Sequence, residues 1–351
     1  MTDVDQLSSE ASRTDALITP HTFLRIARRL PRLRRCQLYF VHVVHSLEPT
    51  LDDTEDVFLN DLPIELDMFH IFGSSCQETG PFLELLSSLC IDRLELELVT
   101  FVQGPNTAAL PLEPRLRQVT VRDLWIDLDT ADDAPCGILS ALSSALSPDT
   151  LEVFHCLWQY WDQCAAVGSF LRNAGRSITD LALDMSVTSW VEEAGDAIQP
   201  EDWNVLNLTS CPNMRTFRTT VCLPLTCSSL DVANVNRSVT SHRHLFSLLP
   251  HTVRTVVIYM SYVQLPYNLR SLRHLISPGA ARDLEVPVDY SKVEDILLEL
   301  PRLEKVIISI RGTEILRQGG AEAVPNAFPG LHAKGILKVQ TGGARPAPSF
   351  W

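Results

Sequence analysis

The stretch Leu300-Pro-Arg-Leu-Glu-Lys-Val-Ile-Ile-Ser-Ile310 decides the fold that we expect for this chain. Before it, apolar side chains from Val293 to Leu300 recur at the i, i+3, i+4, i+7 spacing of one helix face. Pro301 has no N–H and disfavours helical geometry before it, so we expect the helix to end there. The apolar residues that follow alternate as they do in a strand. The stretch therefore predicts a unit made of a helix, a proline stop and a short strand.

The strand pattern, apolar-x-x-apolar-x-apolar, recurs along the chain at intervals of about 30 residues. One such unit cannot bury its apolar face alone, whereas stacked units bury a continuous core. We therefore predict a single solenoid over residues 19–340, between a flexible N-terminal segment (1–18) and a flexible C-terminal tail (341–351). We assign the strands to these residues: Leu33, Cys36, Leu38; Pro63, Leu66, Met68; Ile91, Leu94, Leu96; Leu116, Val119, Val121; Pro148, Leu151, Val153; Ile178, Leu181, Leu183; Met214, Phe217, Thr219; Val253, Val256, Ile258; Ala281, Leu284, Val286; Leu303, Val306, Ile308; and a last copy near Ile336.

The repeated unit resembles the irregular leucine-rich repeats of F-box/LRR proteins, especially the large fungal sets. Its Leu-Pro-x-Leu-x-x-(Cys/Val)-x-(Leu/Ile) pattern follows an amphipathic helix in several copies. The resemblance implies an α/β, irregular leucine-rich-repeat-like solenoid of about eleven modules, with a helix layer outside and short parallel strands inside. It also implies a recognition module for a protein partner, such as a ubiquitin-ligase substrate or adaptor.

The F-box itself is not convincingly present. Asp61-Leu-Pro-Ile-Glu-Leu66 resembles the opening of an F-box, which should continue into a run of helices. Gly73-Ser-Ser75 interrupts that continuation, and the strand pattern at Pro63, Leu66 and Met68 accounts for the same residues. A link to a ubiquitin ligase therefore rests on analogy of fold.

Composition and charge narrow the class of partner. The chain has 351 residues, with 29 Lys and Arg against 43 Asp and Glu, a formal net charge of −14. Nucleic-acid binding needs clustered cations, so we expect no nucleic-acid partner. The basic run from Arg25 to Arg35 can be read as a nuclear-import or nucleic-acid patch, but its arginines alternate at helical spacing with Phe23, Ile26, Ala27 and Leu30. We interpret it as the exposed face of the first helix.

Hydropathy and cysteine usage indicate the compartment. The first residues lack the apolar core of a signal peptide, and no apolar run approaches the length of a membrane span. The nine cysteines form no CxxC pair, which is typical of reduced thiols in a core. We expect a cytoplasmic or nuclear protein, a monomer, without a membrane partner.

The residues between the strand apolars should point away from the helices onto an open face. That face is predicted to be acidic with aromatic anchors, which suits protein binding because aromatics supply contact area and charges steer association. A solvated sheet face without a partner would carry similar residues. The predicted partner-binding residues are Tyr39, Asp67, Phe69, Glu95, Glu97, Arg122, Glu152, Phe154, Asp184 and Tyr259.

No motif in the chain indicates chemistry. GxSxG, Walker A and GxGxxG strings are absent, and the close pairs His42/His45 and His242/His244 lack the spacing of a metal site. We therefore expect no catalytic residue, cofactor or metal, and a protein that is not an enzyme. Two alternatives stay open: a structural or degenerate repeat protein without a selected partner, and an enzyme of unrecognised class.

Overall fold

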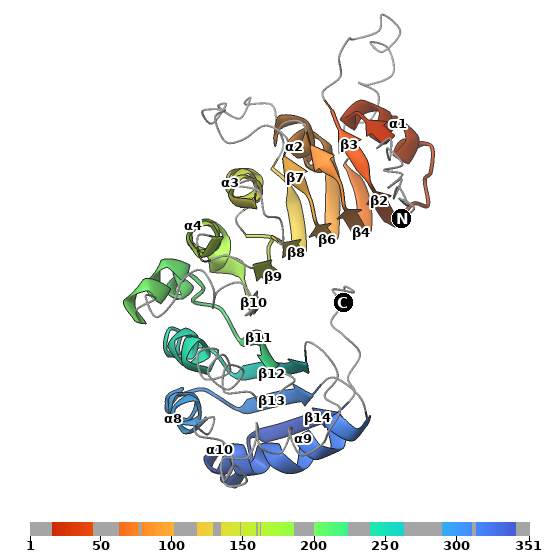
Figure 1. Cartoon of the computed structure of the whole chain (residues 1–351). Coiled ribbons are helices and arrows are strands. Elements are labelled where there is room, and N and C mark those ends of the chain that lie inside the picture. Colours follow the sequence, from red (N-terminus) through yellow and green to blue (C-terminus); the bar gives the residue numbers. More distant parts are fainter. Residues whose placement is uncertain are drawn as a thin grey trace, which may run out of the picture.

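The computed structural model describes twelve parts of the chain that build one arc (Figure 1). Strands line the inside of the arc, and helices such as α3 and α4 lie along its outside. Among these residues, no helix is long and apolar enough to cross a membrane. The described residues are 16–44, 63–76, 79–101, 118–128, 135–147, 149–158, 161, 163–185, 200–223, 239–262, 290–310 and 314–341.

The inner layer is a ten-stranded sheet in the order β14-β13-β12-β11-β10-β9-β8-β6-β4-β2. Every neighbouring pair in it is parallel. Parallel neighbours need a crossover, which the helices supply. The strands are β2 (Arg35–Tyr39), β4 (Ile64–Phe72), β6 (Leu89–Glu97), β8 (Thr120–Asp127), β9 (Val153–Trp158), β10 (Asp180–Met185), β11 (Thr216–Leu223), β12 (Thr255–Tyr262), β13 (Lys305–Ile310) and β14 (Leu337–Thr341).

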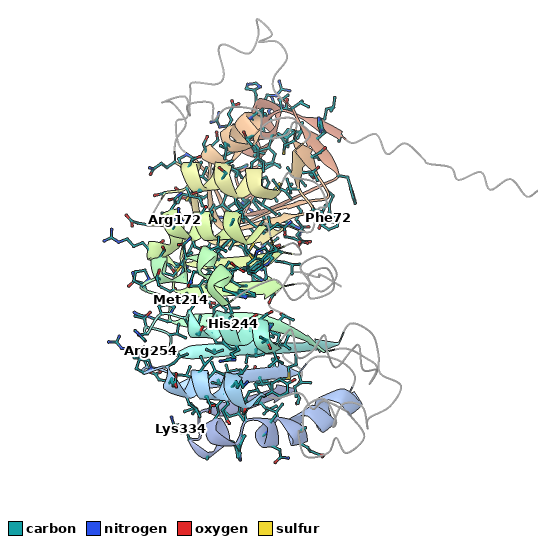
Figure 2. The ribbon with its side chains drawn as sticks, turned by 60° about the vertical axis from the view of Figure 1, so that its left-hand side comes forward. Phe72, Arg172, Met214, His244, Arg254 and Lys334 are labelled. Carbon is teal, nitrogen blue, oxygen red and sulfur yellow. The ribbon has the colours of Figure 1, made fainter. Side chains whose placement is uncertain are left out.

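The outer layer consists of helices that stack in chain order (Figures 1 and 2). Their starts follow from local sequence: the Oγ1 atom of Thr19 accepts the N–H of Thr22 at 3.1 Å, and Pro20 occupies the first helical turn. The helices are α1 (Pro20–Arg28), α2 (Thr79–Ser87), α3 (Pro135–Ala145), α4 (Gln163–Ala174), a helix over 239–247, α8 (Ser291–Glu299), α9 (Glu314–Ala327) and α10 (Pro329–Ala333). Short 3₁₀ turns are η1 (Gly175–Ser177), η3 (Pro200–Leu206) and η4 (Leu208–Ser210).

One continuous core lies between the two layers, and Phe69, Leu96, Phe154 and Leu181 are among its fully buried side chains. The α/β solenoid with its helices outside and its parallel strands inside is thus confirmed. The sequence predicted the register correctly in the strands with Cys36, Leu94, Leu181, Phe217, Val256 and Val306, which all occupy one row of the core.

Three strands use a different register from the predicted one. In β4 the core residues are Leu66, Phe69 and Ile71, in β8 Val121, Leu124 and Ile126, and in β9 Leu151, Phe154 and Cys156. Each of these sets also fits the apolar-x-x-apolar-x-apolar spacing. Two registers therefore satisfied the pattern, and packing against the neighbouring strands selects one of them.

The predicted module at Ala281, Leu284 and Val286 lies outside the described residues. Among the described residues, β12 pairs directly with β13, from Thr255 opposite Lys305 onward. The described part of the chain contributes ten strands to this sheet, against about eleven predicted modules. At the termini, the short strand β1 (Ala16–Ile18) lies within the segment predicted as flexible, and residues 1–15 and 342–351 lie outside the described part of the chain.

A second, four-stranded parallel sheet lies beside the ends of the first strands, in the order β1-β3-β5-β7. Its other strands are β3 (Val41–Val43), β5 (Ser75–Cys76) and β7 (Thr100–Phe101). The chain turns into it through Phe40, Gly73 and Leu98, which follow β2, β4 and β6 and have φ angles of 53°, 55° and 52°. Left-handed geometry is costly for Phe and Leu, so the stacked neighbours must hold these turns in place.

The arginine-rich run from Arg25 to Arg35 was interpreted as the exposed face of the first helix. Arg25, Arg28 and Arg29 are exposed on α1, as expected for the outer face of a helix. Ile26 and Leu30, however, are 52% and 50% exposed, so only Phe23 and Ala27 of the predicted apolar face pack into the core. Trp158, the last residue of β9, is fully buried, and the Trp161 ring lies 5.1 Å from the Trp203 ring.

Candidate functional site

The face of the large sheet that points away from the helices, called the inner face below, carries side chains in rows set by strand pairing. One row runs Gln37, His70, Glu95, Trp125, His155, Ala182, Arg218, Val257, Ile307, Lys338. The next row, two residues further along each strand, runs Tyr39, Phe72, Glu97, Asp127, Leu157, Asp184, Thr220, Tyr259, Ser309, Gln340. Because the strands are parallel and in register, residues far apart in sequence become neighbours.

The first half of the inner face concentrates ionisable groups into one patch. We call this patch the polar cluster: His70, Arg93, Glu95, Glu97, Asp123, Asp127, His155 and Asp184, from strands β4, β6, β8, β9 and β10. Four of its carboxyl-bearing residues and both histidines lie in the two rows named above. Arg93 and Asp123 face each other two residues before the first of these rows. No single segment of the sequence contains the cluster.

Much of the polar cluster is buried although it faces the inside of the arc. Glu97 is 2%, Glu95 5%, Asp127 6% and His70 7% exposed. An aromatic side chain packs within the cluster: the Trp125 ring lies 4.0 Å from the His155 ring and under the Arg93 guanidinium at 4.5 Å. Burial of this kind strengthens electrostatic interactions within the cluster because water screens them less.

Ion pairs link several members of the cluster. Arg93 contacts Glu95 through Nε at 2.5 Å and reaches Asp123 at 3.8 Å through Nη1. The Nε2 atom of His155 lies 2.8 Å from Oδ2 of Asp184, and Nε2 of His70 lies 3.3 Å from Oε1 of Glu97. Arg93 thus contacts two carboxylates of the cluster, and each histidine contacts one.

The polar cluster carries an excess of negative charge. It holds five carboxylates, one arginine and two histidines, so two negative charges remain even if both histidines are protonated. Burial raises the pKa of Asp123, with a smaller contribution from the charge on Glu95. Burial also raises the pKa of the nearby Cys156 thiol, and the charges on Asp127 and Asp184 raise it further. In both groups burial is the main cause, because it penalises the charged form of the acid.

The second half of the inner face, from β10 onward, carries mostly apolar side chains around one paired arginine in the first row. Arg218 on β11 forms a double contact with Asp180 on β10, including an Nε–Oδ1 distance of 2.9 Å. Burial lowers the pKa of Arg218, but hydrogen bonds and charge from Asp180 and Tyr259 more than offset this and raise it overall. Arg218 is therefore fixed within the sheet, and most of its neighbours in the row are apolar.

A third line of charges, called the leading row below, lies where the strands begin. It contains Arg34, Asp67, Asp92, Arg122 and Glu152, and continues to Arg254 and Glu304. Arg122 lies between Glu152, at 3.0 Å, and Asp92, at 3.7 Å, and hydrogen bonding to Glu152 raises its pKa. These pairs are exposed, and exposed ion pairs contribute little to stability.

The predicted partner-binding residues separate into four groups. Tyr39, Asp184 and Tyr259 lie on the inner face, and their role in binding stays a prediction. Glu95 and Glu97 lie there too, but they are buried rather than open to a partner. Asp67, Arg122 and Glu152 belong to the exposed leading row. Phe69 and Phe154 were placed wrongly, because both are fully buried in the core beneath the helices.

Sequence reasoning missed His70, Arg93, Trp125, Asp127 and His155 as inner-face residues. Three of them, His70, Trp125 and His155, form consecutive members of one row with Glu95. Four of the five residues lie on β4, β8 or β9, whose register was misassigned, and the wrong register turned each of these strands to the wrong side. Arg93 lies on β6, whose register was predicted correctly, opposite Asp123 of β8. The signal that could have found them is the second match to the apolar pattern, such as Leu66-x-x-Phe69-x-Ile71.

Comparison with known proteins assigns the chain to no family. No protein-family model matches the chain, and no curated protein matches it. One solved structure, the leucine-rich repeat-containing protein LegL7 from Legionella pneumophila, is similar at a TM-score of 0.35 and 12% sequence identity. The likeness covers 88% of this chain and 89% of that one.

Proposed function

We propose that the chain is a protein-recognition module that binds a protein partner on its inner face. The observation that carries this proposal is the polar cluster, a buried excess of negative charge beside exposed aromatic rings. Tyr39 is 49% and Phe40 40% exposed at the N-terminal end of the sheet, and both contact the Phe72 ring. Exposed aromatics next to a charged, partly desolvated patch are typical of binding hot spots.

The charge of the cluster defines the chemistry of the partner. A segment with arginine or lysine side chains would supply the missing positive charge, and its apolar residues would pack against Tyr39 and Phe40. Electrostatic attraction of this kind accelerates association and weakens as ionic strength rises. We therefore expect a basic protein segment as the ligand.

Affinity purification with mass spectrometry from the native organism tests the proposal. The inner-face variant combines Tyr39→Ala with Asp184→Asn, which removes an exposed ring and one charge. Arg172→Ala is the matched control, because Arg172 is exposed on α4 on the opposite side of the molecule from Phe72 (Figure 2). We expect partners that the inner-face variant loses and the control retains. Equal recovery with both variants, or no specific partner with the wild type, would contradict the proposal and favour a repeat protein without a partner.

A direct binding measurement tests whether binding of the partner depends on charge. Fluorescence anisotropy of a labelled basic segment from a recovered partner should show binding that weakens steadily with added salt. A version of that segment with its Arg and Lys residues changed to Ala should bind at least tenfold more weakly. Binding that is insensitive to salt and to these changes would remove the polar cluster from the proposal.

Glu95 and Glu97 are unsuitable as test positions for partner binding, although the sequence predicts both as partner-binding residues. Both side chains are buried, so two lysines there would perturb the sheet itself. Loss of a partner from that variant would then report unfolding rather than recognition.

The finer expectation, a role as the substrate-reading part of an F-box-type adaptor, needs a separate experiment. Ile64, Glu65 and Leu66 of the F-box-like stretch lie in strand β4, in register with Leu89, Cys90 and Ile91 of β6. We therefore propose that any ubiquitin-ligase subunit binds this chain through another protein. Recovery of such subunits by the purified chain alone would contradict that assignment.

The proposed role is non-catalytic and belongs in the cytoplasm or nucleus. Six cysteines of the described residues, among them Cys76, Cys156 and Cys211, are free thiols, in keeping with a reducing compartment. Localisation of a tagged full-length chain by microscopy tests the compartment.

A further inference from the structure

Three side chains of the polar cluster bring potential metal ligands together. His70 lies on β4 and Glu95 and Glu97 on the adjacent strand β6, where His70 pairs with Glu95 and Phe72 with Glu97. One ligand atom from each residue lies within 4.8 Å of the other two, and all three residues are buried. The pleat places Glu95 and Glu97 on the same side of the sheet as His70. The parallel register therefore produces a convergent set of one nitrogen and two carboxylate oxygens.

Two of these ligand atoms are unsatisfied. Nε2 of His70 and Oε1 of Glu97 are shielded from solvent, and neither has a hydrogen-bond partner. They lie 3.3 Å apart, close enough for an ion pair but without hydrogen-bond geometry. A buried polar atom without a partner is costly, and native proteins rarely keep one without a reason. An ion between the two atoms would satisfy both.

The surroundings favour a cation and keep out water. Arg93 contacts Glu95 and reaches Asp123, which leaves Glu97 without an arginine partner among the described residues. The Tyr39 ring lies 5.6 Å from the His70 ring and the Phe72 ring 6.2 Å from it, so aromatic side chains form one wall of the site. An apolar wall lowers the local dielectric and strengthens metal–ligand interactions.

We propose that His70, Glu95 and Glu97 form a binding site for a divalent transition-metal ion, with zinc as the first choice. Imidazole and carboxylate are both common zinc ligands, at distances of about 2.0–2.2 Å. Calcium and magnesium prefer sites made of oxygen alone, so a histidine in the set disfavours them. Three protein ligands leave a further coordination position for water or for a group of a bound partner. This site does not depend on the proposed protein-binding function.

Isothermal titration calorimetry of the full chain with zinc, after removal of metals by a chelator, tests the site. We expect one equivalent of zinc to bind to the wild type and weak or no binding of magnesium and calcium. Glu97→Gln and His70→Gln each remove one ligand and should weaken zinc binding at least tenfold. Glu65→Gln is the control, because Glu65 is an exposed carboxylate, 73% accessible, on the same strand as His70. Zinc affinity that is equal in all four proteins, or absent in the wild type, would overturn the assignment.

Cobalt substitution of the wild type provides a test that needs no variant. Cobalt bound to one imidazole and two carboxylates should give visible d–d bands without a thiolate-to-metal charge-transfer band. A charge-transfer band would place the ion on cysteine, since Cys36 and Cys90 are half-buried thiols in the same part of the chain, and would overturn the proposal. Circular dichroism of the metal-free proteins would reveal a ligand variant that fails to fold. In that case the cobalt spectrum of the wild type still tests whether the metal binds to His70, Glu95 and Glu97.

Discussion

At the scale of single residues, burial determines what each aromatic side chain does. Phe69 and Phe154 look like the exposed anchors of an acidic strand face, but both are fully buried. The Phe154 ring packs at 4.6 Å from the Phe170 ring of α4, and the Phe69 ring at 5.5 Å from the Phe23 ring of α1. Each therefore joins a strand to an outer helix and contributes to stability rather than to recognition.

Phe154→Ala should lower the free energy of unfolding by about 3–5 kcal/mol, because it leaves a cavity between β9 and α4. Urea denaturation followed by circular dichroism measures the change. Glu152→Ala, two residues earlier in the exposed leading row, is the control and should leave the midpoint nearly unchanged. If the two variants denature at the same urea concentration, β9 uses the register that the sequence alone predicted.

At the scale of elements, close backbone contact fixes how the helices sit on their neighbours. Gly168 of α4 packs against η3, where a Cβ atom would lie 1.8 Å from the Val205 carbonyl oxygen. Gly175 makes a similar approach to Ser210 and Cys211. Glu294 of α8 also acts between elements, because its carboxylate accepts the N–H of Leu331 in α10 at 2.8 Å.

Gly168→Ala should destabilise the chain by about 1–3 kcal/mol, since a methyl group forces the η3 backbone away from α4. Gly137→Ala in α3 is the control: it has open space around it, and alanine favours a helix, so its stability should stay equal or rise. Thermal unfolding of both variants compares them. A melting temperature for Gly168→Ala at or above that of Gly137→Ala would contradict the close contact between α4 and η3.

At the scale of the whole molecule, each module contacts mainly the modules beside it, as the strand order shows. In such an array stability is approximately a sum of local terms and nearest-neighbour interfaces. Damage at one end should therefore spread only a short distance, whereas damage in the middle should separate the two ends.

Leu297→Ala in α8 should raise hydrogen exchange in β12, β13 and β14 and leave β2, β4 and β6 protected, because Leu297 packs at the C-terminal end of the core. Hydrogen–deuterium exchange with mass spectrometry of the native protein measures this. Leu181→Ala, in the central strand β10, should increase exchange on both sides. Uniform loss of protection in the Leu297→Ala protein would mean that the chain unfolds as one unit.

The sequence by itself determined the architecture. Helical spacing that ends at a proline, followed by an alternating apolar triplet such as Leu303, Val306 and Ile308, specifies a helix and a strand locally. Because each unit leaves an apolar face open, repetition implies stacking, and strands joined through helices must be parallel. These inferences need only contacts that are near in sequence.

The tertiary structure alone decided the register of β4, β8 and β9 and the contents of the inner face. Their strands match the apolar pattern in two ways, and only the adjacent strands distinguish Phe69 from Met68 as the core residue. The burial of Glu97 and its approach to His70 likewise depend on the pairing of β4 with β6. Local periodicity determines which elements form, whereas contacts between neighbouring modules determine which side chains meet.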